Sequence, residues 1–130
     1  MHIKLFHNEY RHVNYVPTEK KLITNWFGQI PEKEYVEYID FLNEAVRLYE
    51  IKHLVINTKK AKSHFWMPSR ALIEQVLIKA NKKGAETLTL IQKKFGNALY
   101  MKKAYEKAIK SYGIDMDVSV IEPTSHRIAA

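Results

Sequence analysis

Hydrophobic and polar residues alternate in three short runs over the first 28 residues of the chain. These runs are rich in aromatic and β-branched residues, which predicts β-strands at residues 3–7, 10–16 and 22–27. The segment PTEK separates the last two runs, and its Pro17 presets the backbone angle that a tight turn needs at its second position. We therefore expect an antiparallel hairpin from about Tyr10 to Phe27.

The spacing of apolar residues becomes helical after Gly28 and Gln29. Pro31 suits the start of a helix, and Glu32 and Glu34 follow near the positive end of the helix dipole. Apolar residues then recur at intervals of four and three, which predicts a helix to about residue 49 with one stripe facing a sheet. That stripe consists of Tyr35, Ile39, Leu42, Val46 and Tyr49.

Strand and helix patterns alternate through the rest of the chain. Residues 53–58 have a continuous apolar centre, Leu54 to Ile56, which is typical of a strand covered on both faces. Helices are expected at about 68–83 and 97–112, ending at Gly84 and Gly113, and Asn97 is a candidate N-cap of the later helix. Further strands are expected at 86–92 and 116–121.

This order of elements predicts an α/β fold. Strands that are separated by helices become parallel neighbours through right-handed crossovers, whereas the opening hairpin is antiparallel. We expect a single mixed sheet of about five to six strands with an N-terminal antiparallel hairpin and three packing helices. One domain should span residues 1–122, followed by a flexible C-terminal tail at 123–130.

Three pieces of the sequence carry a family resemblance. They are WFGQIPEKEY (26–35), HLVINTKK (53–60), and KKGAETLTLI with its echo KSYGIDMDVSVI. In order and spacing, across most of residues 10–121, the chain resembles the STAS domain superfamily of bacterial anti-sigma-factor antagonists, especially its small stand-alone bacterial members of unassigned function. The resemblance implies a non-enzymatic regulatory or interaction module that acts through protein–protein contacts, as a homodimer or with an acidic partner.

The resemblance also draws attention to two serines. In the antagonist branch, the loop after the central strand carries an Asp-Ser-Ser/Thr-Gly type signature whose serine is phosphorylated. Here that region reads NTKKAKSHFWMPSRAL, which offers Ser63 and Ser69 without the neighbouring Asp and Gly. A phosphate on Ser69 would meet free helix amides, with Arg70 and Lys62 nearby, but a serine at a helix start also serves as a cap alone. Both interpretations stay open.

The same loop has the densest mixture of cations and aromatic rings in the chain. Open α/β sheets bind ligands beyond the carboxyl ends of their strands, which makes this loop a candidate surface for an anionic small molecule, a lipid or a partner protein. Its two aromatic residues either stack on a ligand or fold back over the core. The candidate residues are Lys59, Lys60, Lys62, His64, Phe65, Trp66 and Arg70.

The charge distribution supplies a further hypothesis. Residues 1–50 carry six Lys/Arg against eight Asp/Glu, and residues 51–130 carry fifteen against six, so the formal charges are −2 and +9. Such polarity attracts anionic partners or merely keeps the protein in solution. The alternatives to an interaction module are a small-ligand or lipid carrier, because the STAS fold is akin to the CRAL-TRIO lipid-binding fold, and nucleic-acid binding through the basic half.

Several classes of chemistry find no support in the sequence. There is no cysteine for a disulfide or a thiolate, the six histidines lack metal-binding spacing, and no phosphate-binding loop or nucleophile elbow occurs. No apolar run approaches the roughly 20 residues of a membrane span, and the N-terminal residues lack the features of a signal peptide. We therefore expect a cytoplasmic protein without catalytic activity, cofactor or metal.

Overall fold

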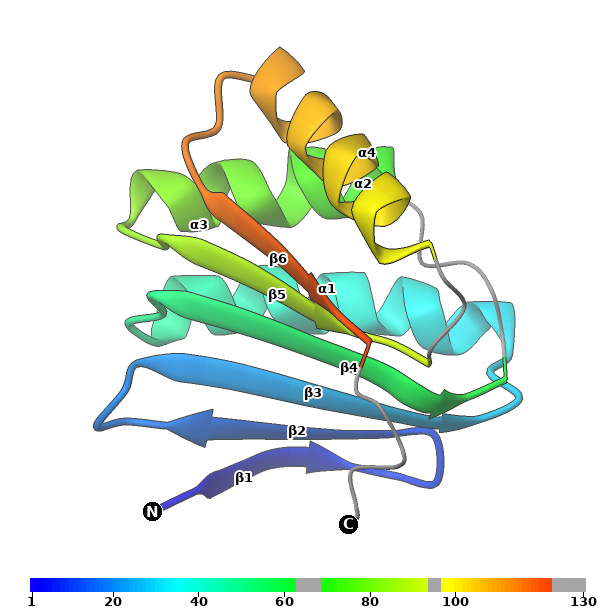
Figure 1. Cartoon of the computed structure of the whole chain (residues 1–130). Helices are drawn as coiled ribbons and strands as arrows, with labels where there is room; N and C mark the ends of the chain where they lie inside the picture. Colours follow the sequence, from blue (N-terminus) through cyan, green and yellow to red (C-terminus); the bar gives the residue numbers. More distant parts are fainter. Residues whose placement is uncertain (63–68, 94–96, 123–130) are drawn as a thin grey trace, which may run out of the picture.

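A computed structural model describes residues 1–62, 69–93 and 97–122 of the chain. One six-stranded sheet and three helical segments make up this part of the molecule, and Figure 1 shows the helices on one side of the sheet. The strands are β1 (Ile3–His7), β2 (Arg11–Val16), β3 (Lys21–Gly28), β4 (His53–Ala61), β5 (Thr87–Ile91) and β6 (Asp117–Ile121).

The helices connect the parallel strands. α1 (Glu32–Leu48) joins β3 to β4, and α4 (Ala98–Ser111) joins β5 to β6. Between β4 and β5 lies one continuous helix with three parts, namely α2 (Arg70–Leu72), a π-helical turn η1 (Ile73–Leu77) and α3 (Ile78–Lys82). The prediction of a mixed α/β sheet with an opening antiparallel hairpin and three helices is confirmed.

The strand order in the sheet is the same as the order along the chain, β1 to β6. β1, β2 and β3 pair antiparallel, whereas β3, β4, β5 and β6 pair parallel. Leu54 of β4 lies between Leu22 of β3 and Leu88 of β5, so the apolar middle of β4 has a parallel strand on each side.

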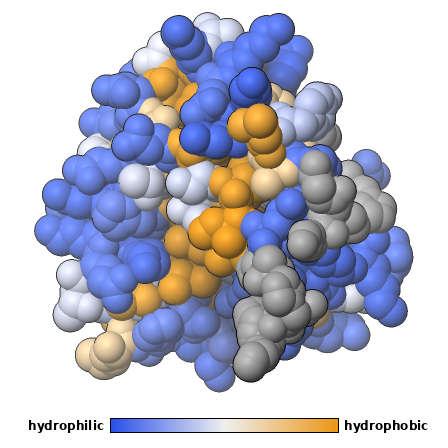
Figure 2. Space-filling view, in the orientation of Figure 1, coloured by the Kyte–Doolittle hydropathy of each residue, from blue (hydrophilic) through white to orange (hydrophobic). Residues whose placement is uncertain are grey.

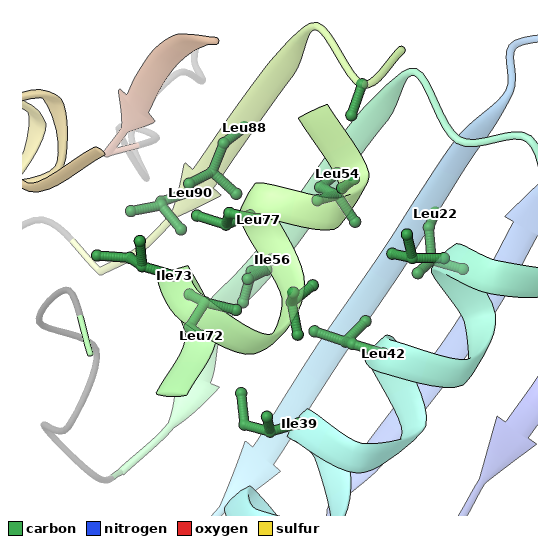
Figure 3. Close-up of a cluster of buried hydrophobic side chains, with 14 of the residues drawn as sticks. Leu22, Ile39, Leu42, Leu54, Ile56, Leu72, Ile73, Leu77, Leu88 and Leu90 are labelled. Carbon is green, nitrogen blue, oxygen red and sulfur yellow. The ribbon is translucent and has the colours of Figure 1, made fainter. Parts of the chain in front are cut away.

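The hydrophobic core lies between the sheet and the helices. Figure 3 shows leucine and isoleucine side chains of β3, β4 and β5 meeting those of α1 and of the second helical segment. Alternate strand residues point away from this core. We call that opposite side the open face, because none of the three helices packs on it. Val55 lies there and is only half-buried, so the prediction that β4 is covered on both faces is wrong.

Several predicted boundaries are confirmed by local geometry. Gly84 and Gly113 follow the second and third helical segments with φ angles of +109° and +72°, a region that glycine adopts without a Cβ clash. Asn97 stands at the N-cap of α4, but it makes no side-chain cap. Its Oδ1 accepts a hydrogen bond from Nε2 of the buried Gln92 at 2.7 Å instead.

A buried ion pair fastens the first turn of α1 to the opening hairpin. Nη1 of Arg11 donates to Oε1 of Glu34 at 2.8 Å, and Nδ2 of Asn8 donates to the same oxygen at 2.9 Å. The Arg11 guanidinium also lies 4.2 Å from the centre of the Phe6 ring. Desolvation lowers the pKa of Arg11, although the Glu34 carboxylate opposes this shift.

In the described ranges, no helix is long and apolar enough to cross a membrane.

Candidate functional site

The carboxyl end of β4 extends beyond its neighbour β5. Pairing with β5 ends at Asn57 and Ile91, whereas pairing with β3 continues to Ala61 and Gly28. Residues 58–61 of β4 therefore have a strand partner on one side only. Lys59 and Lys60, in this stretch, are exposed.

A bulge changes the direction of side chains at this end. Asn25 of β3 pairs with Asn57 of β4, and Phe27 pairs with Lys60, so β4 has one more residue than β3 in this interval. A bulge of this kind bends the strand and redirects its side chains. It places Lys60, instead of Lys59, in register with Phe27.

The two lysines line one open concavity with a volume of about 340 Å³. We call it the bulge concavity and define it by its lining residues, which are Asn25, Trp26, Phe27, Asn57, Lys59 and Lys60. Nδ2 of Asn57 donates to Oδ1 of Asn25 at 3.0 Å, and the backbone amide of Lys59 donates to Oδ1 of Asn57 at 3.0 Å. The asparagine pair thus holds both strands and the bulge in one arrangement.

The ammonium groups of the bulge concavity are not neutralised by the described part of the chain. Among the described residues, no carboxylate oxygen lies within 4.0 Å of Nζ of Lys59 or Lys60. A second basic groove, between α1 and α3, differs in this respect. There Nζ of Lys83 donates to the carbonyl oxygens of Val46 and Arg47, at 2.7 and 2.9 Å, so it stabilises the carboxyl end of α1.

The predicted basic and aromatic surface is divided between two sides of the sheet. Lys59 and Lys60 lie at the open face, whereas Ser69 and Arg70 begin the second helical segment on the helix side. Lys62 is exposed, and its amide donates to the Gly28 carbonyl oxygen at 2.8 Å. The other predicted residues of this surface, Ser63, His64, Phe65 and Trp66, lie outside the described residues.

The hydroxyl group of Ser69 has two partners. Its Oγ accepts from the amide of Leu72 at 3.1 Å, which makes Ser69 the N-cap of α2. Its Oγ also lies 2.8 Å from the hydroxyl of Tyr35 on α1, and burial raises the pKa of that tyrosine. Arg70 bonds to the carboxylate of Glu74 at 3.3 Å. Phosphorylation of Ser69 stays a prediction, and it requires Oγ to leave both partners.

We expect Ser69→Ala to lower the free energy of unfolding by about 1 kcal/mol, because it removes the cap of α2. The measurement is urea unfolding followed by circular dichroism. Tyr35→Phe is the matched control, since it removes the bond to Ser69 and retains the cap. Equal stability of Ser69→Ala and the wild type would show that the cap contributes nothing.

An apolar band crosses the open face beside the bulge concavity. It consists of side chains on β3 to β6 that alternate with core residues, and Figure 2 shows hydrophobic residues gathered in the middle of this side of the molecule. Ile23, Val55 and Ile91 are half-buried, and Ile121 is 44% exposed. A shallow hollow of about 590 Å³ includes Val55 and Ile91, with Lys21 and His53 also on its border.

A further set of basic side chains lies on α4. Nζ of Lys102 on α4 lies 3.9 Å from the Glu106 carboxylate, while Lys103, Lys107 and Lys110 are exposed. Across the described segments, no group of three or more His, Asp or Glu side chains is arranged to hold a metal ion.

Reasoning from sequence did not predict which residues line the bulge concavity together with Lys59 and Lys60. Asn25, Phe27 and Asn57 come from two strands, and only the register of β3 against β4 brings them together. The segments ITNWF and VINTKK each contain an asparagine after apolar residues, which is the available signal. The bulge itself has no sequence signature here.

No protein-family model matches the chain, and no curated protein matches it in sequence.

Proposed function

We propose that the protein is a non-enzymatic interaction module of the STAS-like type that binds a partner protein on its open face. The observation that carries the proposal is the apolar band of Ile23, Val55, Ile91 and Ile121, which none of the three helices covers. A contiguous apolar patch bordered by polar residues is typical of protein–protein interaction sites.

The charge beside the band defines the kind of partner. Lys59 and Lys60 stand at the carboxyl end of β4, next to the row in which Asn57 pairs with Ile91. A partner surface with an apolar centre and acidic residues on one side would complement both features. The resemblance to anti-sigma-factor antagonists supports the same class of function.

The test is native mass spectrometry of the protein purified from its own host. We expect a stoichiometric complex with the wild type and loss of that complex in Val55→Lys. A lysine in the centre of the band would have its charge buried against the bound protein with no opposite charge to pair with. Leu48→Lys is the matched control, since Leu48 is 59% exposed at the end of α1 and lies away from the open face.

Two results would contradict the proposal. One is a bare monomer in the wild-type sample. The other is a complex that Val55→Lys retains while its circular dichroism spectrum matches that of the wild type.

A further inference from the structure

We propose that the bulge concavity binds a phosphomonoester group. Lys59 and Lys60 also border the partner surface proposed above, but the phosphate site goes beyond that function because it needs neither the apolar band nor a partner protein. The inference starts from the extra residue in β4, which brings two consecutive lysines, Lys59 and Lys60, to the border of one concavity. In a regular strand, consecutive side chains point to opposite faces.

The two positive charges of Lys59 and Lys60 favour an anion that carries two negative charges. Both side chains are exposed, and neither has a carboxylate within 4.0 Å in the described ranges. A phosphomonoester carries about −1.5 to −2 charges near pH 7 and offers three strong acceptor oxygens. Lysine ammonium groups serve as point charges for phosphate.

The remaining residues of the concavity supply a neutral donor and an apolar wall. Oδ1 of Asn25 accepts from Asn57, which fixes the orientation of the Asn25 amide and leaves its Nδ2 as a hydrogen-bond donor. The half-buried Phe27 ring lies against His12, with 4.7 Å between the ring centres. The volume of about 340 Å³ is at the lower end of the range for small-molecule sites.

The basic groove between α1 and α3 does not fit this role, because most of its cations already have partners. Lys83 uses its ammonium group on the last carbonyl oxygens of α1, and Nζ of Lys79 donates to Oδ1 of Asn43 at 3.0 Å. Arg47 is paired with Glu44. Three of the four cations of that groove therefore already have partners, whereas neither Lys59 nor Lys60 has a carboxylate partner among the described residues.

The experiment is a titration of the ¹⁵N-labelled full chain with phenyl phosphate, followed by amide chemical shifts at about 150 mM salt, where weak surface attraction is screened. We expect saturable shifts confined to residues 25–28 and 57–62. The Lys59→Gln/Lys60→Gln variant should weaken binding about tenfold or more, because it removes two charge-assisted hydrogen bonds.

The matched control is Lys103→Gln/Lys107→Gln, which removes the same charge from the exposed side of α4 and should leave the affinity unchanged. Equal weakening in both double variants, or shifts without saturation in the wild type, would overturn the proposal.

A short phosphoserine peptide, titrated in parallel, shows whether the phosphate group comes from a modified protein or from a small molecule. Tighter binding of the peptide assigns it to a modified protein, and tighter binding of phenyl phosphate assigns it to a small molecule; binding of neither contradicts the site.

Discussion

Glu34→Ala is expected to lower the free energy of unfolding by about 3–5 kcal/mol, because it leaves the Arg11 guanidinium buried without its carboxylate. The side chains of Arg11 and Glu34 are only 2% and 7% exposed. An unpaired charge at such a position keeps its full desolvation cost. The loss is large compared with a total stability of roughly 5–15 kcal/mol for a domain of this kind.

Denaturant unfolding followed by circular dichroism measures this effect, and two further variants define its origin. Glu32→Ala removes an exposed carboxylate from the same helical turn and should cost less than about 1 kcal/mol. Arg11→Met/Glu34→Leu removes both charges and should recover most of the loss, because Nε of Arg11 has no hydrogen-bond partner among the described residues. A double variant as unstable as Glu34→Ala would contradict this account.

Leu77→Ala is expected to lower the free energy of unfolding by about 2–5 kcal/mol. Leu77 is fully buried in the π-helical turn η1, where Figure 3 places it among side chains of the sheet and of the second helical segment. The cost has two parts, namely the lost burial of the removed atoms and the cavity that the surrounding side chains cannot fill. The same unfolding measurement applies.

Leu99→Ala makes the same chemical change on α4, where the leucine is 65% exposed. We expect it to change stability by no more than about 0.5 kcal/mol. If both leucine variants lost similar stability, the core between the sheet and η1 would not be as closely packed as the burial of Leu77 indicates. The difference between the two is the quantity that tests the packing.

The sequence predicted the elements of the fold because periodicity reports local structure. The alternating runs of the hairpin, the stripe with Ile39, Leu42 and Val46, and the glycines at 84 and 113 lie where the structure has the corresponding elements. Parallel pairing of β4 with two neighbours also followed from the alternation of strands with helices. These features depend on residues close together in the chain.

Features that depend on register or on distant partners were not predicted. The apolar run Leu54–Ile56 looks alike whether helices cover one face or two, so the open face was missed. Glu34 was interpreted only through the helix dipole, because its partner Arg11 lies 23 residues away. Asn97 bonds to Gln92 instead of capping α4. A one-residue bulge in β4 changes which lysine faces Phe27 without any local signal.

The agreement between strand order and chain order has a consequence for biosynthesis. Each strand pairs with the one made immediately before it, so no strand has to be inserted between two that are already joined. As the chain leaves the ribosome from its N-terminus, the hairpin can form first. Every later strand can then pair with the last strand of the sheet that has already formed, and its helix can pack on that sheet. The growing chain therefore presents a single incomplete edge at each stage, which limits the chance of pairing with the wrong strand.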